Sequence, residues 1–453
     1  MRRQRDRSQT ETPNRDGTAF GNGAFAAGNG DTALGFHANT GADFSTAVGA
    51  NATIAAYVGS AEQLAEYLAA AGMPYAVSAM VAFLFAASGP VAIILAVGAR
   101  GGLAESDIAS WIFAAFCLNS VISIAFTLAY RQPLIFLWSI PGAVLVGPAL
   151  GHLSFPEVVG AFLVTGVLML LLGLSGWVRR AMEAVPMPIV MAMVAGVFLR
   201  FGVDLVLAFR DHLWIALPMT AAFALLSAVP GLARVLPPLV GALIAGGLAV
   251  GVLGAFKPPA TALLALAAPN LYLPQFSWAA MVELVVPLAV TVLAVQNAQG
   301  VAILAANGHQ APVNAITAAC GVGSVVTGLF GAVSTCLTGP VSAVLSSAGE
   351  THRQYVGALF FCLFAAAFGV LAPFFTRLLL ATPPAFIATL AGLAMLRVLQ
   401  TAFTASFGGR FSFGALICFL VTVADVPILQ IGAPFWGLVF GLAVSWLLEH
   451  RAP

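Results

Sequence analysis

The sequence contains two stretches, SIPGAVL at residues 139–145 and STCLTGPV at residues 334–341, in which hydroxyl, glycine and proline residues interrupt apolar segments. Proline in the first turn of a helix loses no hydrogen bond, whereas the residues before it favour an extended backbone. Each stretch is therefore predicted to form an extended segment followed by a half-helix. Because irregular backbone at membrane depth must be satisfied by protein or by a water-filled cavity, two facing breaks predict a cavity at the middle of a membrane.

The composition around these stretches indicates a lipid environment. Of the 453 residues, 60% are hydrophobic and only 8% are charged, and the mean hydropathy is +0.99, whereas an average soluble domain is roughly 25% charged. Repeated apolar runs of about 20 residues have the length that a helix needs to cross a bilayer. The net charge of +1 and the lack of a basic cluster argue against a nucleic-acid partner.

Apolar runs between polar, proline or glycine breaks predict an all-α polytopic membrane protein with about fourteen transmembrane segments. The third and tenth segments are short and contain the two quoted stretches. The predicted spans cover residues 74–98, 106–129, 133–150, 156–178, 184–203, 212–230, 236–254, 281–305, 312–331, 333–348, 354–375, 383–403, 411–428 and 432–448.

The two halves of this region have related patterns, so we predict a first repeat over about residues 74–254 and a second over about residues 281–448. An odd number of spans in each repeat inverts the second copy, which predicts a seven-plus-seven inverted repeat and transport by alternating access. The fifth and twelfth spans share one spacing of small residues, at Pro188, Ala192, Ala195 and Gly196 and at Pro384, Ala388, Ala391 and Gly392.

Residues 1–72 form a separate polar region ahead of the predicted transporter domain at residues 73–453. The strings TAFG, TALG and TAVG recur every 14 residues, beginning at residues 18, 32 and 46. The period resembles the head repeats of trimeric adhesins, which form a β-roll. The alternative is a disordered low-complexity tail.

The half-helix starts are the first candidate binding site. A helix N-terminus presents free N–H groups and the positive end of its dipole, which suits an anionic group such as a carboxylate. The alternative is that proline and glycine only kink packed helices. The candidate residues in the two stretches are Ser139, Gly142, Thr335, Thr338 and Gly339.

Three carboxamides follow one another near the end of the eighth span, at Gln296, Asn297 and Gln299. Amides are costly in hydrocarbon unless they are hydrogen-bonded. They could tie helices together, or they could face a cavity and orient a ligand without adding a repelling charge.

The carboxylates Asp204, Glu283 and Asp425 are the candidate proton-coupling groups, because acidic residues within membrane spans are functional candidates. All three lie toward the ends of spans, so solvated interfacial carboxylates are the alternative. Arg200 and Arg397 are interpreted as side chains that extend to the interface.

The sequence contains no catalytic or phosphate-binding motif, so neither an enzyme nor an ATP-driven pump is predicted. Its five cysteines lie in apolar segments without the spacing of metal ligands, and we expect no cofactor or metal. These are Cys117, Cys320, Cys336, Cys362 and Cys418.

Five polar strings are more specific than membrane composition: VQNAQG at 295–300, PVNA at 312–315, ACGVGS at 319–324, VSTCLTGP at 333–340 and PAFIATLAGL at 384–393. In these strings the sequence resembles the benzoate/proton symporter family, and the likeness extends from about residue 74 to the end. The resemblance implies the inverted-repeat fold of nucleobase–ascorbate transporters, with a core domain, a gate domain and a possible homodimer.

The resemblance also implies uptake of benzoate or a similar aromatic carboxylate with a proton across the bacterial inner membrane. Nucleobase carriers contact substrate with an acidic residue of the eighth span, where this chain has Gln296 or Asn297, which suits an anionic ligand. We hypothesise that the carboxylate lies between the half-helix N-termini and that its ring lies on Phe85 and Phe136. The alternatives are a nucleobase or other organic-anion carrier of the same fold, a passive anion channel, and an adhesin-type surface protein with a membrane anchor.

Overall fold

The computed structural model describes most of the chain beyond residue 72 and six short segments before it. The described residues are 18–20, 25–26, 32–34, 39–40, 46–48, 53–54, 73–178, 180, 186–229, 231, 236–258, 264–347, 349–429 and 431–449.

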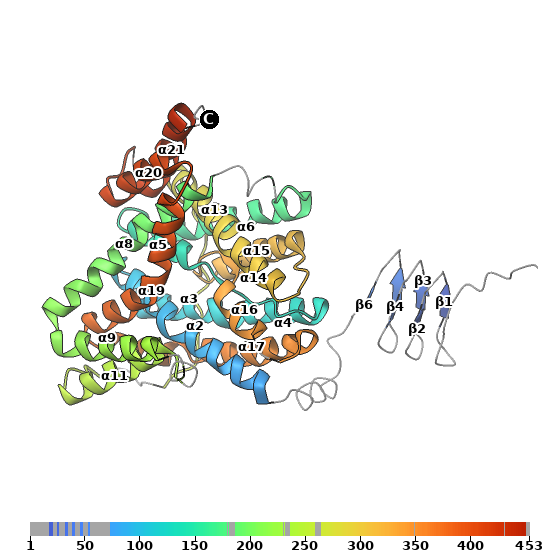
Figure 1. The fold of residues 1–453 in the computed structure, drawn as a ribbon, viewed down its shortest axis with the longest axis horizontal. Helices are drawn as coiled ribbons and strands as arrows, with labels where there is room; N and C mark the ends of the chain where they lie inside the picture. Colours follow the sequence, from blue (N-terminus) through green and yellow to red (C-terminus); the bar gives the residue numbers. More distant parts are fainter. Residues whose placement is uncertain are drawn as a thin grey trace, which may run out of the picture.

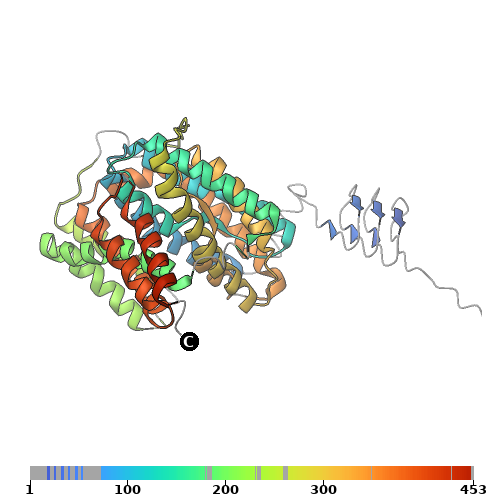
Figure 2. The same cartoon turned by 90° about the horizontal axis from the view of Figure 1, so that it is seen from above.

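The six N-terminal segments are short strands with the 14-residue spacing of the sequence repeat. They form two three-stranded parallel sheets, β1-β3-β5 and β2-β4-β6, in which each residue pairs with the residue 14 positions later. Figure 2 shows them as two rows. The strands are β1 Thr18–Phe20, β2 Phe25–Ala26, β3 Thr32–Leu34, β4 Asn39–Thr40, β5 Thr46–Val48 and β6 Thr53–Ile54.

Beyond residue 72 the chain is a polytopic helical membrane protein in which the helices pack as two bundles (Figure 1). The first bundle contains two short strands. Its elements are α2 Met73–Arg100, α3 Glu105–Phe113, η1 Ala114–Leu118, α4 Asn119–Tyr130, β7 Phe136–Trp138, α5 Ile140–Ala149, α6 Phe155–Ser175, α12 Trp278–Ala280, η2 Met281–Val285, α13 Val286–Val290, η3 Thr291–Asn297, α14 Ala298–Ala306, α15 Val313–Gly328, β8 Thr335–Leu337, α16 Gly339–Ser346, η4 Thr351–Arg353, α17 Gln354–Val370 and α18 Ala372–Leu380.

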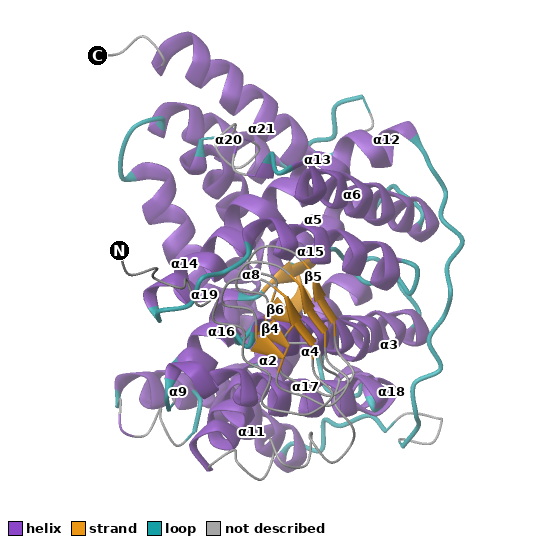
Figure 3. Ribbon diagram, turned by 90° about the vertical axis from the view of Figure 1, so that its right-hand side faces the viewer, coloured by secondary structure: helices purple, strands orange, loops and turns teal. Residues whose placement is uncertain are grey.

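The second bundle is wholly helical. Helices α9 and α11 lie side by side at one edge of the molecule, and α20 and α21 lie side by side at the opposite edge (Figures 1 and 3). Its elements are α8 Met187–Asp211, α9 Leu213–Ala228, α11 Pro238–Val252, α19 Pro384–Phe407, α20 Ser412–Ala424, α21 Ala433–Val444 and η5 Ser445–Glu449.

Seven helices within the described residues are long and apolar enough to cross a membrane. Six further apolar helices have 10 to 17 residues. The predicted number of fourteen spans and the seven-plus-seven repeat therefore stay predictions. The seven long helices are Tyr75–Arg100, Glu105–Tyr130, Phe155–Ser175, Met187–Asp211, Trp278–Ala306, Thr351–Val370 and Pro384–Phe407.

The prediction of an extended segment followed by a half-helix is confirmed in both quoted stretches. Strand β7 leads into α5, and strand β8 leads into α16. The prediction that the membrane region is all-α was wrong in this detail, because the two strands pair with each other. The antiparallel register joins Leu137 to Cys336, and flanking bonds run from Ser139 N–H to the Ser334 carbonyl and from Thr338 N–H to the Ile135 carbonyl, both at 2.9 Å.

Side chains of neighbouring helices satisfy the outer edges of this strand pair. The hydroxyl of Ser123 in α4 accepts from the N–H of Phe136 at 2.8 Å, and the hydroxyl of Ser324 in α15 accepts from the N–H of Thr335 at 2.9 Å. Thr127 donates to the carbonyl of Leu134. An isolated two-stranded pair can therefore exist among helices because few of its backbone groups lack a partner.

An extended segment, residues 264–277, crosses the ends of three helices of the first bundle. Its backbone N–H groups donate to carbonyls at the end of α17, just after α15 and at the start of α6. Figure 3 shows it as the teal loop along one edge of the molecule, between α12 and α18. This segment connects the two halves of the chain without contributing a helix.

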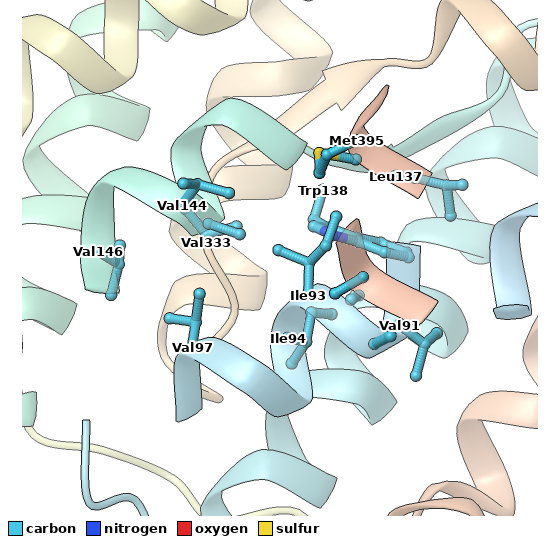
Figure 4. Packing of buried hydrophobic residues seen from close by; sticks show 14 of the residues in the cluster. Val91, Ile93, Ile94, Val97, Leu137, Trp138, Val144, Val146, Val333 and Met395 are labelled. Carbon is cyan, nitrogen blue, oxygen red and sulfur yellow. The ribbon is translucent and has the colours of Figure 1, made fainter. Parts of the chain in front are cut away.

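The two bundles meet where α2 crosses α19. A Cβ at Gly89 would lie 2.5 Å from the Cβ of Ala394, so only glycine lets the two helices approach this closely. Figure 4 shows the adjoining core, in which Ile93 of α2, Trp138 of β7 and Met395 of α19 lie together. All three side chains are buried. The strand pair is thus held in a buried core that both bundles share.

Helices α8 and α19, which contain the fifth and twelfth predicted spans, form the largest contact of the second bundle. A Cβ at Gly392 would lie 2.7 Å from the carbonyl oxygen of Phe201. Gly392, one of the small residues that the two spans share in sequence, therefore lies in this helix contact.

Candidate functional site

A cavity of about 880 Å³, here called the wide pocket, lies between the two bundles. Its wall is mainly apolar, which is typical of a small-molecule site. The lining residues are Phe85, Ile140, Pro141, Met187, Met191, Phe223, Ser227, Pro237, Pro238, Leu239, Ala294, Val295, Gln296, Ala298, Gln299, Pro340, Leu393, Ala394, Arg397, Val398, Thr401 and Ala405.

The starts of both half-helices reach this pocket. Pro141 in the first turn of α5 and Pro340 in the first turn of α16 both line it. The strand pair brings these two starts together although they are about 200 residues apart in the chain. The pocket therefore receives the positive ends of two helix dipoles.

Three predicted binding residues line the wide pocket: Phe85, Gln296 and Gln299. Gln296 lies in η3, a π-helical stretch, and such stretches occur often at functional sites. The Gln299 side chain lies against Gly339, where an added Cβ would be 2.9 Å from it. Gly339 therefore gives room to a polar side chain of the pocket wall.

Ser139 and Gly142 support the start of α5. Ser139 is fully buried, and its hydroxyl accepts from the N–H of Gly142 at 3.1 Å as a helix N-cap. This bond occupies one of the free N–H groups on which the carboxylate hypothesis relies. Thr338 caps α16 without a side-chain bond to the helix, so the two starts are not equivalent.

Asn297, Thr335 and Phe136 have partners inside the protein and do not stand among the lining residues described. The Asn297 Oδ1 accepts from the N–H of Leu337 at 2.8 Å, and Thr335 Oγ1 donates to Asn119 Oδ1 at 2.9 Å. The Phe136 ring packs against Phe126 with 5.3 Å between centroids. These side chains hold the strand pair in place behind the pocket wall.

Arg397 of α19 is a pocket residue that sequence reasoning interpreted as interfacial. It lines the wide pocket together with Ala394 and Thr401. The sequence does carry a signal, because these residues lie three and four positions from Arg397 and so share one face of a helix.

Helices α2, α8 and α19 all contribute residues to the wide pocket. A second cavity of about 500 Å³, here called the narrow pocket, lies at the opposite ends of these three helices. On α2 the wide pocket reaches Phe85 and the narrow pocket reaches Arg100, about 22 Å farther along the helix axis. The same reversal holds for α8 and α19. The α2–α19 contact around Gly89 and Ala394 lies between the two pockets.

Asp204, one of the three candidate carboxylates, lines the narrow pocket. It forms an ion pair with Arg100, whose guanidinium also lies over the ring of Phe201. The pair joins α2 of the first bundle to α8 of the second. Its position indicates a structural clamp between the bundles at this end.

Glu283, the second candidate, is buried, with 3% of its side chain exposed, and its Oε2 lies 2.9 Å from Nε2 of His152. Gly432, the residue before α21 in the second bundle, lies so close to this carboxylate that a Cβ there would overlap Oε1. Glu283 is therefore a buried carboxylate at the contact between the bundles.

Asp425, the third candidate, follows α20 and is exposed. Partial desolvation raises the pKa of its carboxyl, and the charges of Arg200 and His152 oppose this. His152 thus interacts electrostatically with two of the three candidate carboxylates. Among the described residues, no group of three or more histidine, cysteine or acidic side chains is arranged to hold a metal ion.

Comparison with known proteins identifies the family. A family model described as benzoate membrane transport protein matches residues 70–447. The chain belongs to this family. It is accordingly a multi-pass membrane transporter and not an enzyme.

Two curated relatives are similar to this chain over most of their length. The inner membrane protein YdcO of Escherichia coli is 29% identical over 376 residues, covering 81% of this chain and 94% of YdcO. The benzoate membrane transport protein of Acinetobacter baylyi is 26% identical over 380 residues, covering 82% of this chain and 94% of that protein.

Similar solved structures show the fold. The transmembrane domain of the cyanobacterial bicarbonate transporter BicA has a TM-score of 0.53 at 16% identity, covering 82% of this chain and 97% of that domain. Murine SLC26A9, an anion transporter solved in the inward-facing state, has a TM-score of 0.56 at 13% identity, covering 87% of this chain and 72% of that protein. These neighbours are bicarbonate and SLC26 transporters, whereas the sequence resemblance implied nucleobase–ascorbate transporters.

Replacing Asn297 with alanine should destabilise the protein because the buried N–H of Leu337 would lose its acceptor. The expected loss in free energy of unfolding is about 1–3 kcal/mol, measured by denaturant unfolding in detergent. Gln299→Ala is the matched control, since this exposed amide lines the pocket and should change stability by less than about 0.5 kcal/mol. Unchanged stability of Asn297→Ala with weakened ligand binding would instead place this amide in the pocket.

Proposed function

We propose that this protein is a secondary active transporter that imports benzoate or a similar aromatic carboxylate together with a proton across the bacterial inner membrane by alternating access. The wide pocket is the observation that carries the proposal. This pocket combines apolar walls, two half-helix starts and two carboxamides. Benzoate is the substrate named in the descriptions of the family and of the A. baylyi relative.

The chemistry of the pocket suits both parts of such a substrate. Phe85 and the aliphatic wall accept an aromatic ring, and burial of roughly 100 Å² of ring surface contributes about 2.5 kcal/mol. The half-helix starts stabilise a carboxylate by about 0.3–2 kcal/mol each. Gln296 and Gln299 add hydrogen bonds without the negative charge that would repel the substrate.

Two pockets at opposite ends of α2, α8 and α19 support alternating access. In this proposal the wide pocket receives the substrate, and the α2–α19 contact and the Arg100–Asp204 pair join the bundles beyond it. Rocking of the second bundle against the first would narrow the wide pocket and widen the narrow pocket. A passive channel is less well supported because this contact interrupts the path between the pockets.

Glu283 is the proton-coupling group that we favour among the three candidates. Protonation removes a buried charge at a contact between the bundles, so it changes the energy of moving one against the other. His152, Glu157, Asp425 and Arg200 are the charged or titratable groups around this position. The possible homodimer stays a prediction.

Purified full-length protein in liposomes should accumulate labelled benzoate when the outside is more acidic than the inside. Collapse of the gradient with a protonophore should release the accumulated label. Gln296→Ala should weaken uptake affinity about fivefold, the effect of one hydrogen bond worth about 1 kcal/mol. Gln132→Ala, an amide outside the lining residues, is the control. Competition by uracil but not by benzoate would contradict the proposal.

Glu283→Gln should abolish proton-driven accumulation of benzoate while leaving exchange of internal for external benzoate. Exchange requires movement of the loaded carrier but no net proton transfer, so it separates coupling from binding. Both rates are measured with the same liposomes. Asp425→Asn should retain both activities, and retained accumulation in Glu283→Gln would exclude Glu283 as the coupling group.

Asp204→Ala should open the narrow pocket by removing the ion pair between α2 and α8. A partly exposed pair contributes about 0.5–1 kcal/mol, so the open population should rise about two- to fivefold. The open population is measured by labelling with an impermeant maleimide in a protein whose Cys117 is replaced by serine. A cysteine introduced as A388C reports access to the narrow pocket, and one introduced as T401C reports access to the wide pocket. Asp211→Ala is the control, since Asp211 pairs with the adjacent Arg210. Equal labelling in both variants would argue against the clamp.

A further inference from the structure

Arg397 is the one formally charged side chain among the described residues that line the wide pocket. Every other lining residue is apolar or an uncharged hydroxyl or amide. The described wall of the pocket therefore carries one positive charge before any ligand enters. No carboxylate in its described wall repels an anion.

The position of Arg397 on α19 directs it to the pocket. Leu393, Ala394, Thr401 and Ala405 line the same cavity from that helix, and these spacings place them on one face with Arg397. Arg397 thus belongs to the pocket wall.

Within the described part of the chain, no carboxylate lies within ion-pair distance of Arg397. Its Nη1 donates to Gln400 Oε1 at 3.4 Å, a long bond to a neutral group one turn away. The arginines at the narrow pocket and beside α3 differ, because Arg100 pairs with Asp204 and Arg377 pairs with Glu105. The Arg397 side chain is exposed, so an anion that enters the pocket can reach its guanidinium and supply the missing partner.

We infer that Arg397 binds the carboxylate of the substrate and makes the wide pocket selective for anions. The guanidinium presents a planar fork of donors that matches a carboxylate in a bidentate arrangement. The half-helix starts add only partial charges, and the carboxamides add none, so Arg397 is the group that separates an aromatic acid from its neutral analogue.

This assignment also gives the ligand a position between the bundles. Arg397 belongs to the second bundle, whereas Pro141, Pro340 and the carboxamides belong to the first. An anion in the pocket is attracted from both sides, so its binding favours their approach. The inference rests on the proposed function for its substrate class.

The test is binding of benzoate and of its neutral isostere benzamide to the purified full-length protein, measured by calorimetry. Arg397→Gln should raise the Kd for benzoate at least about tenfold, the effect of losing a charge-assisted bond. Its effect on benzamide should stay below about twofold. Arg397→Lys should retain part of the preference for the anion, because it keeps the charge but not the fork.

Arg410→Gln is the matched control for general surface charge. Arg410 lies over the ring of Phe411 and is absent from the residues described as lining the pocket, so its removal should leave both affinities unchanged. Equal weakening of benzoate and benzamide in Arg397→Gln would mean that Arg397 only shapes the cavity. Unchanged benzoate binding would also overturn the inference.

Benzenesulfonate as a third ligand separates this inference from the proposed function. If the wild type fails to bind benzoate but binds benzenesulfonate, and Arg397→Gln abolishes that binding, the proposed substrate is wrong and the anion site stands. If the wild type binds neither anion, both fail. Transport of benzoate that is unaffected by Arg397→Gln would sustain the proposed function and reject Arg397.

Discussion

The hydrogen-bonded pair of β7 and β8 is the constraint on which the rest of the structure depends. Two extended segments can stop inside a membrane-spanning region only if their backbone groups find partners. They find them in each other, with Ser123, Ser324 and Asn297 serving the outer edges. Because the strands lie side by side, the half-helices that follow them start at one place, and that place is the wall of the wide pocket.

The distribution of charge follows from this arrangement. Where α2 meets α8 at the narrow pocket, Arg100 and Asp204 neutralise each other, and where α21 approaches η2, Glu283 is buried beside His152. At the wide pocket, Arg397 has no ion-pair partner among the described residues. In the function that we propose, the paired charges hold the bundles together at one end, and the unpaired Arg397 is available to an anionic substrate.

Several particulars of the site could be derived from the sequence because they are local. The prolines that start α5 and α16 set the extended-then-helical backbone through their own geometry. Phe85, Gln296 and Gln299 were among the predicted binding residues, and they line the pocket. Arg397 was interpreted differently because one arginine near a span end is compatible with both lipid interface and cavity, and hydropathy does not distinguish these surroundings.

The sequence by itself determined that the chain spans a membrane and where its helices break, since apolar length and proline chemistry act within one segment. Only the tertiary structure decided which polar residues face the pocket. Gln296 and Asn297 are adjacent in the chain but point in different directions around the helix, so one lines the cavity while the other supports β8. That outcome depends on how η3 is rotated against a strand some 40 residues later, which no local pattern encodes.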